Sequence, residues 1–437
     1  MSGTARHKDV GLRTLREHAD PGKMRRVILV GVAGNVLEWY DFAVYGYFAA
    51  AIGAQFFPAA DPTASLIAAF GVFAAGFLTR PLGGVLFGHI GDHLGRKPAL
   101  IASVVTMAVP TFLLGLLPTY DRIGLWAPIL LVALRLLQGL SVGGEYATSI
   151  VYAVEHAPPH RRGLVGGWIG CGAIGGILLG SAVGAALNAV LSAEELSAWG
   201  WRIPFLLGIL VGGVGLLLRR GLVDAEPMPQ PQRDSDIPIV AAFRTAWMGM
   251  LQIIGLSALN GAGFYLLFVY SVTYLHESLG MPTWQAFDIN TASMVLLLAV
   301  MPAGAALSDR VGRKPVLAAA SGATALLAWP LFRLLHHHDP AVVLLGQMGF
   351  ALLLGLFFGT VPAVLAEVFP RKVRCSAFSV AYNVSLAVFG GLSPMVVTYL
   401  IGRTHDDMVP AFVVIAVAAV SLAATLTLPE TSRAPLR

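Results

Sequence analysis

Five ionisable side chains lie inside long apolar stretches of the sequence, where their types and spacing can support chemistry. Glu38 and Asp41 lie in the first stretch, Arg80 in the second, and Arg135 and Glu145 in the fourth. A charge in such surroundings is costly, so each of these groups is a functional candidate. Buried acids can carry a proton, and a buried guanidinium can hold a carboxylate through two hydrogen bonds.

The two acids of the first stretch are three residues apart, so they lie about one turn apart on the same face of a helix. Two carboxylates at that separation resist joint ionisation, and one is expected to be protonated over part of the working pH range. We predict that Glu38 and Asp41, together with Glu145, take up and release a proton. The alternative that stays open is a structural ion pair between these acids and Arg80 or Arg135.

Two interpretations of Arg80 stay open: it binds a substrate carboxylate, or it neutralises an acid of the first stretch. Arg135 has the same two interpretations and can also pair with Gln138, three residues further on. The second half of the chain has no ionisable group at comparable depth, so it must contribute amides and phenols, whose aromatic faces can hold a quaternary ammonium. The residues predicted to contact a small polar solute are Asn35, Tyr45, Arg80, Arg135, Gln138, Asn260, Tyr265, Tyr382 and Asn383.

The composition places these residues in a membrane. The chain has 437 residues, of which 56% are hydrophobic and 12% are charged, and its mean hydropathy is +0.74. A typical soluble domain has about 25% charged residues. The composition therefore excludes a soluble enzyme, a disordered protein and a nucleic-acid-binding domain. Cys171 and Cys375 both lie in apolar segments, so neither a disulfide framework nor a Cys-rich metal site is expected.

Twelve apolar stretches are long enough to cross a bilayer as α-helices, which need about 20 residues each. They cover residues 25–53, 64–89, 98–117, 126–152, 163–190, 201–219, 245–275, 287–308, 315–335, 341–365, 375–401 and 409–428. The predicted fold class is an all-α membrane protein with twelve transmembrane helices. A polar segment too rich in proline for a continuous helix separates the sixth stretch from the seventh. The predicted organisation is a cytoplasmic tail (1–24), an N-terminal six-helix half (25–219), a cytoplasmic linker (220–244), a C-terminal six-helix half (245–428) and a short tail (429–437).

The charged residues predict the orientation of the chain. Most of the 29 Lys and Arg residues lie in the N-terminal tail, the linker and the loops on the same side. The loops on the opposite side carry Arg122, Arg202, Arg333 and Arg403. By the positive-inside rule, both termini are expected to be cytoplasmic.

Two loop motifs recur in the two halves. Residues 91–98 read GDHLGRKP and residues 308–315 read SDRVGRKP, whereas residues 155–158 read EHAP and residues 367–370 read EVFP. Recurrence of both motifs at nearly one offset indicates an internal duplication. We predict that these loops form a cytoplasmic gate. The Asp and Arg of the first motif form charge-assisted bonds to neighbouring helix ends, and these bonds break when the gate opens. Glu155 with Arg162, and Glu367 with Arg374, are predicted to be further parts of that gate. The predicted gate residues are Asp92, Gly95, Arg96, Lys97, Glu155, Arg162, Asp309, Gly312, Arg313, Lys314, Glu367 and Arg374.

The repeated loops resemble the signature of the major facilitator superfamily, and motifs in the spans resemble its metabolite:proton symporter family. These motifs are GNVLEWYDF at residues 34–42, GFLTRPLGG at 76–84, RLLQGLSVGGEY at 135–146 and WGWRIPF at 199–205. The resemblance implies two halves in a pseudo-two-fold arrangement, with the site between them near mid-membrane. Members of that family import proline and betaine, citrate and tricarballylate, α-ketoglutarate or shikimate together with protons. The last two spans look most like the proline/betaine and citrate branches.

The sequence therefore predicts a transporter, not an enzyme, in the bacterial cytoplasmic membrane, importing a small polar solute with protons by alternating access. The two buried arginines have acidic neighbours, which favours a zwitterion such as proline or betaine over an organic acid such as citrate or α-ketoglutarate. No phosphate-binding loop is present, so the proton gradient is expected to drive transport without a cofactor. The expected partners are the solute, protons and the lipid bilayer, without nucleic acid or metal, and the chain is expected to be a monomer. The alternatives are an uncoupled facilitator or exchanger of organic acids, and a solute sensor with a transporter fold.

Overall fold

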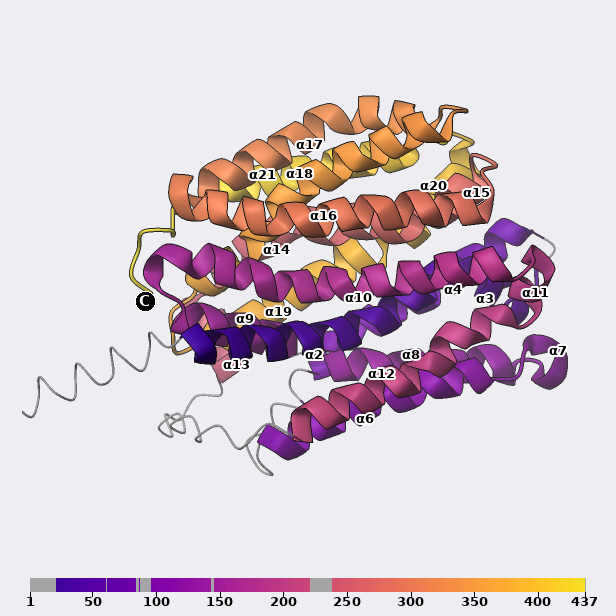
Figure 1. Ribbon diagram of the computed structural model, residues 1–437, viewed down its shortest axis with the longest axis horizontal. Helices are drawn as coiled ribbons and strands as arrows, with labels where there is room; N and C mark the ends of the chain where they lie inside the picture. The colour runs from indigo at the N-terminus through magenta and orange to yellow at the C-terminus, as the bar shows by residue number, and fades with distance from the viewer. Residues whose placement is uncertain are drawn as a thin grey trace, which may run out of the picture.

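The computed structural model describes residues 21–59, 61–83, 86, 96–142, 145–220 and 238–436. Over these residues the chain forms helices and no strand. The long helices run side by side along one axis of the molecule (Figure 1). The end where α2 begins and the chain's C-terminal residues lie is called the terminal end below, and the opposite end is called the far end.

The N-terminal half comprises the long helices up to residue 220. They are α2 (Pro21–Tyr47), α3 (Ala49–Phe56), α4 (Pro62–Leu78), α6 (Arg96–Leu116), α8 (Trp126–Val142), α9 (Glu145–His156), α10 (Arg162–Val190) and α12 (Ile203–Arg220). Two short helices lie in far-end loops: α7 (Tyr120–Ile123) and α11 (Ala193–Ala198). Single 3-10 turns, η1 (Pro159–Arg161) and η2 (Gly200–Arg202), precede α10 and α12.

The C-terminal half begins with the short helix α13 (Pro238–Thr245). Its long helices are α14 (Trp247–Ala258), α15 (Tyr270–Glu277), α16 (Thr283–Val311), α17 (Arg313–Leu335), α18 (Pro340–Glu367), α19 (Arg374–Ser385), α20 (Ser393–Thr404) and α21 (Val409–Thr427). Three π-helical segments interrupt two of the spans: η3 (Leu259–Gly263) and η4 (Tyr265–Val269) join α14 to α15, and η5 (Leu386–Gly391) joins α19 to α20.

The helices follow the predicted apolar stretches. In the described part of the chain, nine helical segments are long and apolar enough to cross a membrane. The predicted spans 98–117 and 201–219 correspond to the shorter apolar segments Ile101–Leu116 and Gly200–Val214, and the predicted span 25–53 is helical over α2 and α3. Most of the predicted boundaries lie within a few residues of the helix ends.

Most of the predicted linker and the N-terminal tail are not described. Residues 221–237 and the tail up to residue 20 lie outside the described residues. The last residues of the predicted linker form the short helix α13. Pro238 is the first residue of α13, a position where the missing N–H of proline breaks no helical hydrogen bond.

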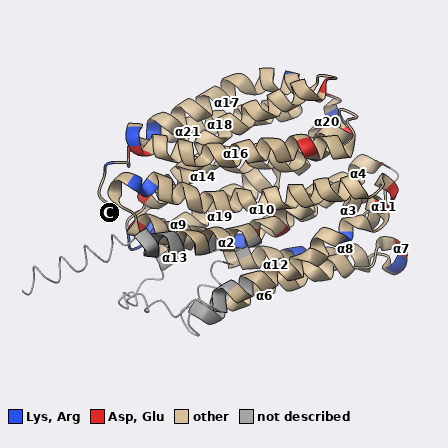
Figure 2. Cartoon of the chain, in the orientation of Figure 1, with Lys and Arg blue, Asp and Glu red and all other residues tan. Residues whose placement is uncertain are grey.

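The outer surface of the bundle is apolar, as a lipid-facing surface must be. Large hydrophobic side chains on it are strongly exposed, for example Leu326 at 80% and Leu210 at 63%. Figure 2 shows most of the described helix surface without charge, with many of the charged residues gathered near the two ends of the bundle. Exposed tryptophans such as Trp126, Trp247 and Trp329 add the amphipathic rings that membrane interfaces favour.

A row of glycines lets α10 approach the other helices closely. A Cβ atom at Gly172 would lie 2.6 Å from the carbonyl oxygen of Val32, and one at Gly176 would lie 2.4 Å from that of Val36. The same row ends at Gly184, where a Cβ atom would lie 2.3 Å from the ring of Phe287 in α16. Small residues four positions apart lie on one face of a helix and let a neighbouring helix approach closely, and here they bring α2 and α10 together beside the cavity described next.

Candidate functional site

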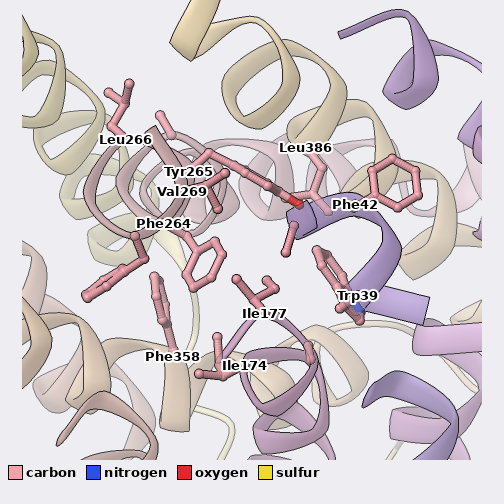
Figure 3. Close-up of a cluster of buried hydrophobic side chains, with 14 of the residues drawn as sticks. Trp39, Phe42, Ile174, Ile177, Phe264, Tyr265, Leu266, Val269, Phe358 and Leu386 are labelled. Atoms are coloured by element: carbon pink, nitrogen blue, oxygen red, sulfur yellow. The ribbon is translucent and has the colours of Figure 1, made fainter. Parts of the chain in front are cut away.

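The described residues enclose a cavity of about 30 Å³ between the two halves. Its wall is built by residues of α2, α9, α10, η3, η4, α16, α18, α19 and η5. Figure 3 shows a cluster of buried hydrophobic side chains that includes several of these residues, among them Trp39, Ile174 and Phe358. Its wall is mostly aromatic or aliphatic, with one amide and three tyrosines. The lining residues are Trp39, Tyr146, Gly170, Ala173, Ile174, Ile177, Asn260, Phe264, Tyr265, Met301, Phe358, Tyr382 and Leu386.

The π-helical segments position the C-terminal half's share of the wall. Asn260 lies in η3, Tyr265 in η4 and Leu386 in η5. Segments of this kind are frequent at functional sites because the wider turn redirects side chains. A Cβ atom at Gly261 would lie 3.0 Å from the backbone nitrogen of Gly390, so glycines let η3 and η5 pack backbone to backbone.

Arg80 is buried next to this wall, with 1% of its surface exposed. Its guanidinium carbon lies 4.9 Å from the ring centre of Trp39, 4.5 Å from that of Phe42 and 4.6 Å from that of Phe77. None of its three guanidinium nitrogens has a hydrogen-bond partner within the described residues. The rings stabilise the cation through their faces, which leaves its N–H donors for an acceptor that the described side chains do not supply.

Aromatic faces and phenols complete the surroundings of Arg80. The rings of Tyr146 and Tyr382 stack with centroids 5.1 Å apart, and Trp39 meets Tyr146 edge to face at 5.9 Å. Asn260 donates a hydrogen bond of 3.1 Å to the hydroxyl of Tyr382. The buried hydroxyl of Tyr265 has no hydrogen-bond partner within the described residues, and its side chain extends toward α2 (Figure 3).

The two acids of α2 have different surroundings, although they lie one turn apart. Glu38 is close enough to Arg80 to interact with its charge. Asp41 accepts a hydrogen bond of 2.8 Å from the hydroxyl of Thr111 in α6 and interacts electrostatically with Arg135. The third predicted acid, Glu145, begins α9, but its side chain lies outside the described residues.

Arg135 forms a second buried cationic site on the Asp41 side. Its guanidinium lies 4.3 Å from the ring centre of Tyr45 and 4.8 Å from that of Phe42. One of its nitrogens donates to the Oε1 atom of Gln138 at 2.9 Å. The hydroxyl of Tyr45 donates to the backbone carbonyl of Ala69 instead of facing the cavity.

The other two predicted contact residues do not line the cavity. Asn35 donates to the carbonyl of Ile169 at 3.2 Å, in the interface between α2 and α10. Asn383 donates to the carbonyl of Ser379 in its own helix at 2.9 Å. Of the nine predicted contact residues, the structure therefore brings Asn260, Tyr265 and Tyr382 to the cavity wall, with Arg80 beside it.

At the terminal end, charged residues of the second repeated loop connect the two halves. Asp309 at the end of α16 accepts hydrogen bonds from the backbone nitrogens of Gly163 and Leu164, at 2.8 and 2.9 Å. These nitrogens belong to the first turn of α10, where helix N–H groups lack partners in the helix. Arg313 pairs with Asp309 at 2.8 Å and with both carboxylate oxygens of Glu367, at 3.1 and 3.2 Å.

Each acid of the second motif pairs with an arginine of another loop. Glu155 forms its ion pair with Arg374 of the other half, not with Arg162. Glu367 pairs with Arg313, as described, and Arg162 donates to the backbone carbonyl of Ala434 at 3.1 Å. The packing therefore produces ion pairs between loops, and the role of these residues in a gate stays a prediction.

The C-terminal residues also take part in this terminal-end network. Glu430 accepts hydrogen bonds from the backbone nitrogens of Arg313 and Lys314, at 2.9 and 3.0 Å. Gly312 has a φ of +112°, and a Cβ atom there would lie 2.7 Å from the carboxylate of Glu430, so glycine is required. The ammonium of Lys314 donates to the last carbonyls of α21. Burial raises the pKa of Glu430, but hydrogen bonds from the backbone of Ser432, Arg313 and Lys314 outweigh it and lower the pKa below 4.5.

The first copy of this loop is largely outside the described residues. Asp92 and Gly95 lie there, and Arg96 and Lys97 begin α6 with side chains that are not described. The predicted role of these four residues in the gate remains a prediction.

Neutral groups connect the two halves on the far-end side of the cavity. The hydroxyl of Tyr47 in α2 donates to the carbonyl of Phe268 at 2.8 Å. The amide of Asn290 in α16 donates to Tyr47 at 3.2 Å and to Ser181 of α10 at 3.0 Å. The cavity therefore lies between a charged network at the terminal end and a neutral one on the far-end side.

Several residues of the site were not predicted from the sequence. Trp39, Tyr146, Phe264 and Phe358 line the cavity, and Thr111 is the hydrogen-bond partner of Asp41. Three of these aromatic residues are sequence neighbours of predicted ones. Successive residues of a helix point about 100° apart, so adjacency in sequence did not tell which neighbour faces the cavity.

Comparison with known proteins places this arrangement among transporters. The family described as sugar (and other) transporter matches residues 27–222 and 241–437. The chain is 37% identical over 430 residues to the glycine betaine/proline/ectoine/pipecolic acid transporter OusA of Dickeya dadantii (strain 3937), covering 96% of this chain and 86% of that protein. It is 36% identical over 446 residues to the proline/betaine transporter of Escherichia coli (strain K12), covering 99% and 89%.

Solved structures show the same fold. A D-xylose-proton symporter superposes with a TM-score of 0.73 at 20% identity, covering 93% of this chain and 98% of that one. The proton:xylose symporter XylE of the major facilitator superfamily, bound to 6-bromo-6-deoxy-D-glucose, gives 0.72 at 17% identity, covering 94% and 97%. The fold is thus that of the major facilitator superfamily, as the repeated loop motif indicated.

Proposed function

Because the chain belongs to the sugar (and other) transporter family, within the major facilitator superfamily, we propose that it is a secondary transporter that imports a small zwitterionic osmolyte with protons. The substrate class is the proline and betaine type named for its relatives of 36% and 37% identity. The location is the bacterial cytoplasmic membrane, with both termini in the cytoplasm as the basic loops predict.

Arg80 carries this proposal. The guanidinium nitrogens of Arg80 have no partner among the described residues, and a buried guanidinium without acceptors is costly unless a ligand supplies them. A substrate carboxylate supplies two acceptor oxygens in the geometry that a guanidinium matches. The aromatic rings around Arg80 hold its charge without using its N–H groups.

The aromatic wall supplies the second half of a zwitterion site. The faces of Trp39, Tyr146 and Tyr382 suit a quaternary or secondary ammonium, which they attract through their ring quadrupoles. One cation plus an aromatic wall fits one carboxylate and one ammonium. It fits a tricarboxylate such as citrate poorly, because a site for three negative charges would favour several cations.

We assign the binding of the transported proton to Glu38 and Asp41, the two acids of α2. Glu38 lies near Arg80, and Asp41 lies near Arg135, so each acid is in electrostatic contact with a buried cation. Protonation of such an acid changes the charge balance of its site, which can couple solute binding to proton movement. The charged terminal-end network and the neutral contacts on the far-end side would open in turn during alternating access.

The test is proton uptake by proteoliposomes on addition of single solutes. The panel is proline, glycine betaine, citrate, tricarballylate, α-ketoglutarate and shikimate. We expect external alkalinisation with a zwitterion and none with the acids, and loss of the signal when Glu38 and Asp41 are both neutralised. Alkalinisation with an organic acid alone would refute the zwitterion. Solute binding without proton movement would favour a facilitator, an exchanger or a sensor.

Arg80→Lys tests the site itself. Lysine keeps the charge but loses the planar pair of donors, and losing one charge-assisted hydrogen bond costs about 1.5–3 kcal/mol. Solute affinity should therefore fall about 10- to 150-fold. The matched control is Arg202→Lys, because Arg202 also lies on a tryptophan ring, at 4.2 Å from Trp201, but away from the cavity wall. If Arg80→Lys and Arg202→Lys bound the solute with equal affinity, Arg80 would not belong to the binding site.

A further inference from the structure

A chain of hydrogen bonds runs from Arg135 to Asp41 through two neutral side chains. Arg135 donates to Gln138 Oε1 at 2.9 Å, Gln138 Nε2 donates to Thr111 Oγ1 at 2.6 Å, and Thr111 Oγ1 lies 2.8 Å from Asp41 Oδ2. The four side chains come from α8, α6 and α2, and each is 2% exposed or less. Neither Thr111 nor its contact with Asp41 was predicted from the sequence.

The chemistry of the four groups determines the direction of this chain. A guanidinium only donates, so the carbonyl oxygen of Gln138 must face Arg135 and its NH₂ group must face Thr111. Thr111 Oγ1 therefore accepts from Gln138 and has one proton of its own to donate. Two acceptors lie within reach of that proton: Asp41 Oδ2 at 2.8 Å and the carbonyl of Met107 at 2.9 Å.

The charge of Asp41 selects between these two acceptors. When Asp41 is ionised, it can only accept, and the Thr111 hydroxyl donates to it through a charge-assisted bond. When Asp41 Oδ2 carries a proton, that O–H donates to Thr111 Oγ1, and the threonine proton turns to the carbonyl of Met107. The O–H bond of Thr111 does not break in this exchange. The proton on Asp41 comes from solvent and returns to solvent.

We propose that Thr111 is a positioning residue for proton coupling, whose hydroxyl turns between Asp41 and Met107 as Asp41 gains and loses its proton. The inference rests on the proposed function, because it assumes that Asp41 carries the transported proton. The other carboxylate oxygen, Oδ1, has no hydrogen-bond partner among the described residues. Thr111 is thus the hydrogen-bond donor that the described part of the structure supplies to this carboxylate.

The surroundings of Asp41 contain few other groups that respond to pH. Arg135 of α8 and Tyr40 of α2 interact with it electrostatically, and Glu38 lies one turn away on α2. The helices α6 and α12 present Thr111 and Gly208, neither of which titrates; a Cβ atom at Gly208 would lie 3.5 Å from Asp41 Oδ1. The helix α10 presents its glycine row to α2.

The experiment measures the pH dependence of proton-driven uptake of proline or glycine betaine in proteoliposomes. Thr111→Val removes the donor from the ionised carboxylate at nearly constant volume, so ionisation of Asp41 becomes harder. One charge-assisted hydrogen bond corresponds to about one to two pH units. The pH midpoint of uptake should therefore move upward by about that amount, while solute exchange without net proton movement continues. Thr111→Ser, which keeps the hydroxyl, should restore the wild-type profile.

Thr324→Val is the matched control. Thr324 is also fully buried and also donates to the carbonyl four residues earlier, Ala320, at 2.8 Å, and within the described part of the chain its hydroxyl makes no hydrogen bond to a carboxylate. Its variant should keep the wild-type midpoint. If Thr111→Val does not reach the membrane, Thr111→Cys, a weaker donor, should give a smaller upward shift.

The outcomes separate this inference from the proposed function. An upward shift in Thr111→Val, absent in Thr111→Ser and Thr324→Val, supports the positioning role. A wild-type midpoint in both Thr111→Val and Thr111→Cys overturns it while leaving proton symport intact. Absence of proton uptake by the wild-type protein with either zwitterion would instead overturn the proposed function.

Discussion

Replacing Gly176 by alanine tests how closely α2 and α10 must pack for the site to form. The new Cβ atom would lie 2.4 Å from the carbonyl oxygen of Val36 and 3.0 Å from the backbone nitrogen of Tyr40. Ordinary van der Waals contact begins at 3.4 Å, so the two helices must separate by about 1 Å. Both obstructing atoms belong to the backbone, so no side-chain rotation relieves the clash.

The cost follows from that separation. Overpacking of a close interface costs about 1–3 kcal/mol, which is about 5- to 150-fold in the population of the native packing. The separation also changes the cavity, because Trp39 lies on α2 whereas Ile174 and Ile177 lie on α10. Gly176→Ala should therefore lower both the melting temperature in detergent and the affinity for the solute.

The neighbouring residue provides the control. A Cβ atom at Gly175 would lie 3.5 Å from a methyl group of Val36 and would make an ordinary contact. Alanine is favoured over glycine in a helix by about 1 kcal/mol. Gly175→Ala should therefore melt at or above the wild-type temperature and bind solute normally. If Gly176→Ala matched Gly175→Ala in both measurements, the close approach of α2 and α10 would not matter for the site.

Three further perturbations test the wall, the gate and the C-terminal contact. Trp39→Leu removes an aromatic face whose attraction for a cation is worth about 2 kcal/mol when desolvated, so the affinity for betaine should fall about 30-fold. Replacing the exposed Trp126 by leucine should leave that affinity unchanged. Equal losses of affinity in both variants would contradict the role of the aromatic wall. Asp309→Asn weakens the hydrogen bonds between Asp309 and the first turn of α10, which join the halves at the terminal end. Spin labels at the terminal ends of α10 and α18 should therefore move apart. An unchanged distribution of distances between the labels would contradict the gate. Because the pKa of Glu430 is lowered, its contacts stabilise the fold fully above the ordinary pKa of a glutamate, about 4.3, and this stabilisation is lost as the pH falls through the lowered pKa. The difference in melting temperature between wild type and Glu430→Gln should therefore shrink below that pH; a constant difference would contradict this assignment.

Local sequence properties predicted the helices well. The predicted span 163–190 is α10 at Arg162–Val190, and the predicted span 409–428 is α21 at Val409–Thr427. Each span is long, apolar and bounded by polar residues, so its ends depend on the neighbouring sequence alone. The cost of burying charge likewise identified Arg80, Arg135 and the acids of α2 without knowledge of the packing.

The partners of those residues could not be predicted, because they depend on how each helix is rotated and shifted against the others. Spacing suggested that Glu38 and Asp41 act together, but the packing of α4 and α6 against α2 brings one near Arg80 and the other to Thr111. Spacing likewise does not show that Glu155 pairs with Arg374 across the two halves.

The sequence by itself therefore determined the class of the protein, its spans and the set of charges that must be explained. Only the tertiary structure decided which of these charges have partners and which aromatic rings form the cavity wall. The physical reason is the separation along the chain over which each kind of interaction acts. Hydropathy and helix formation act over a few turns of one chain segment. The contacts of Arg80, Trp39 and Tyr382 join residues up to about three hundred positions apart, and close packing throughout the bundle sets them.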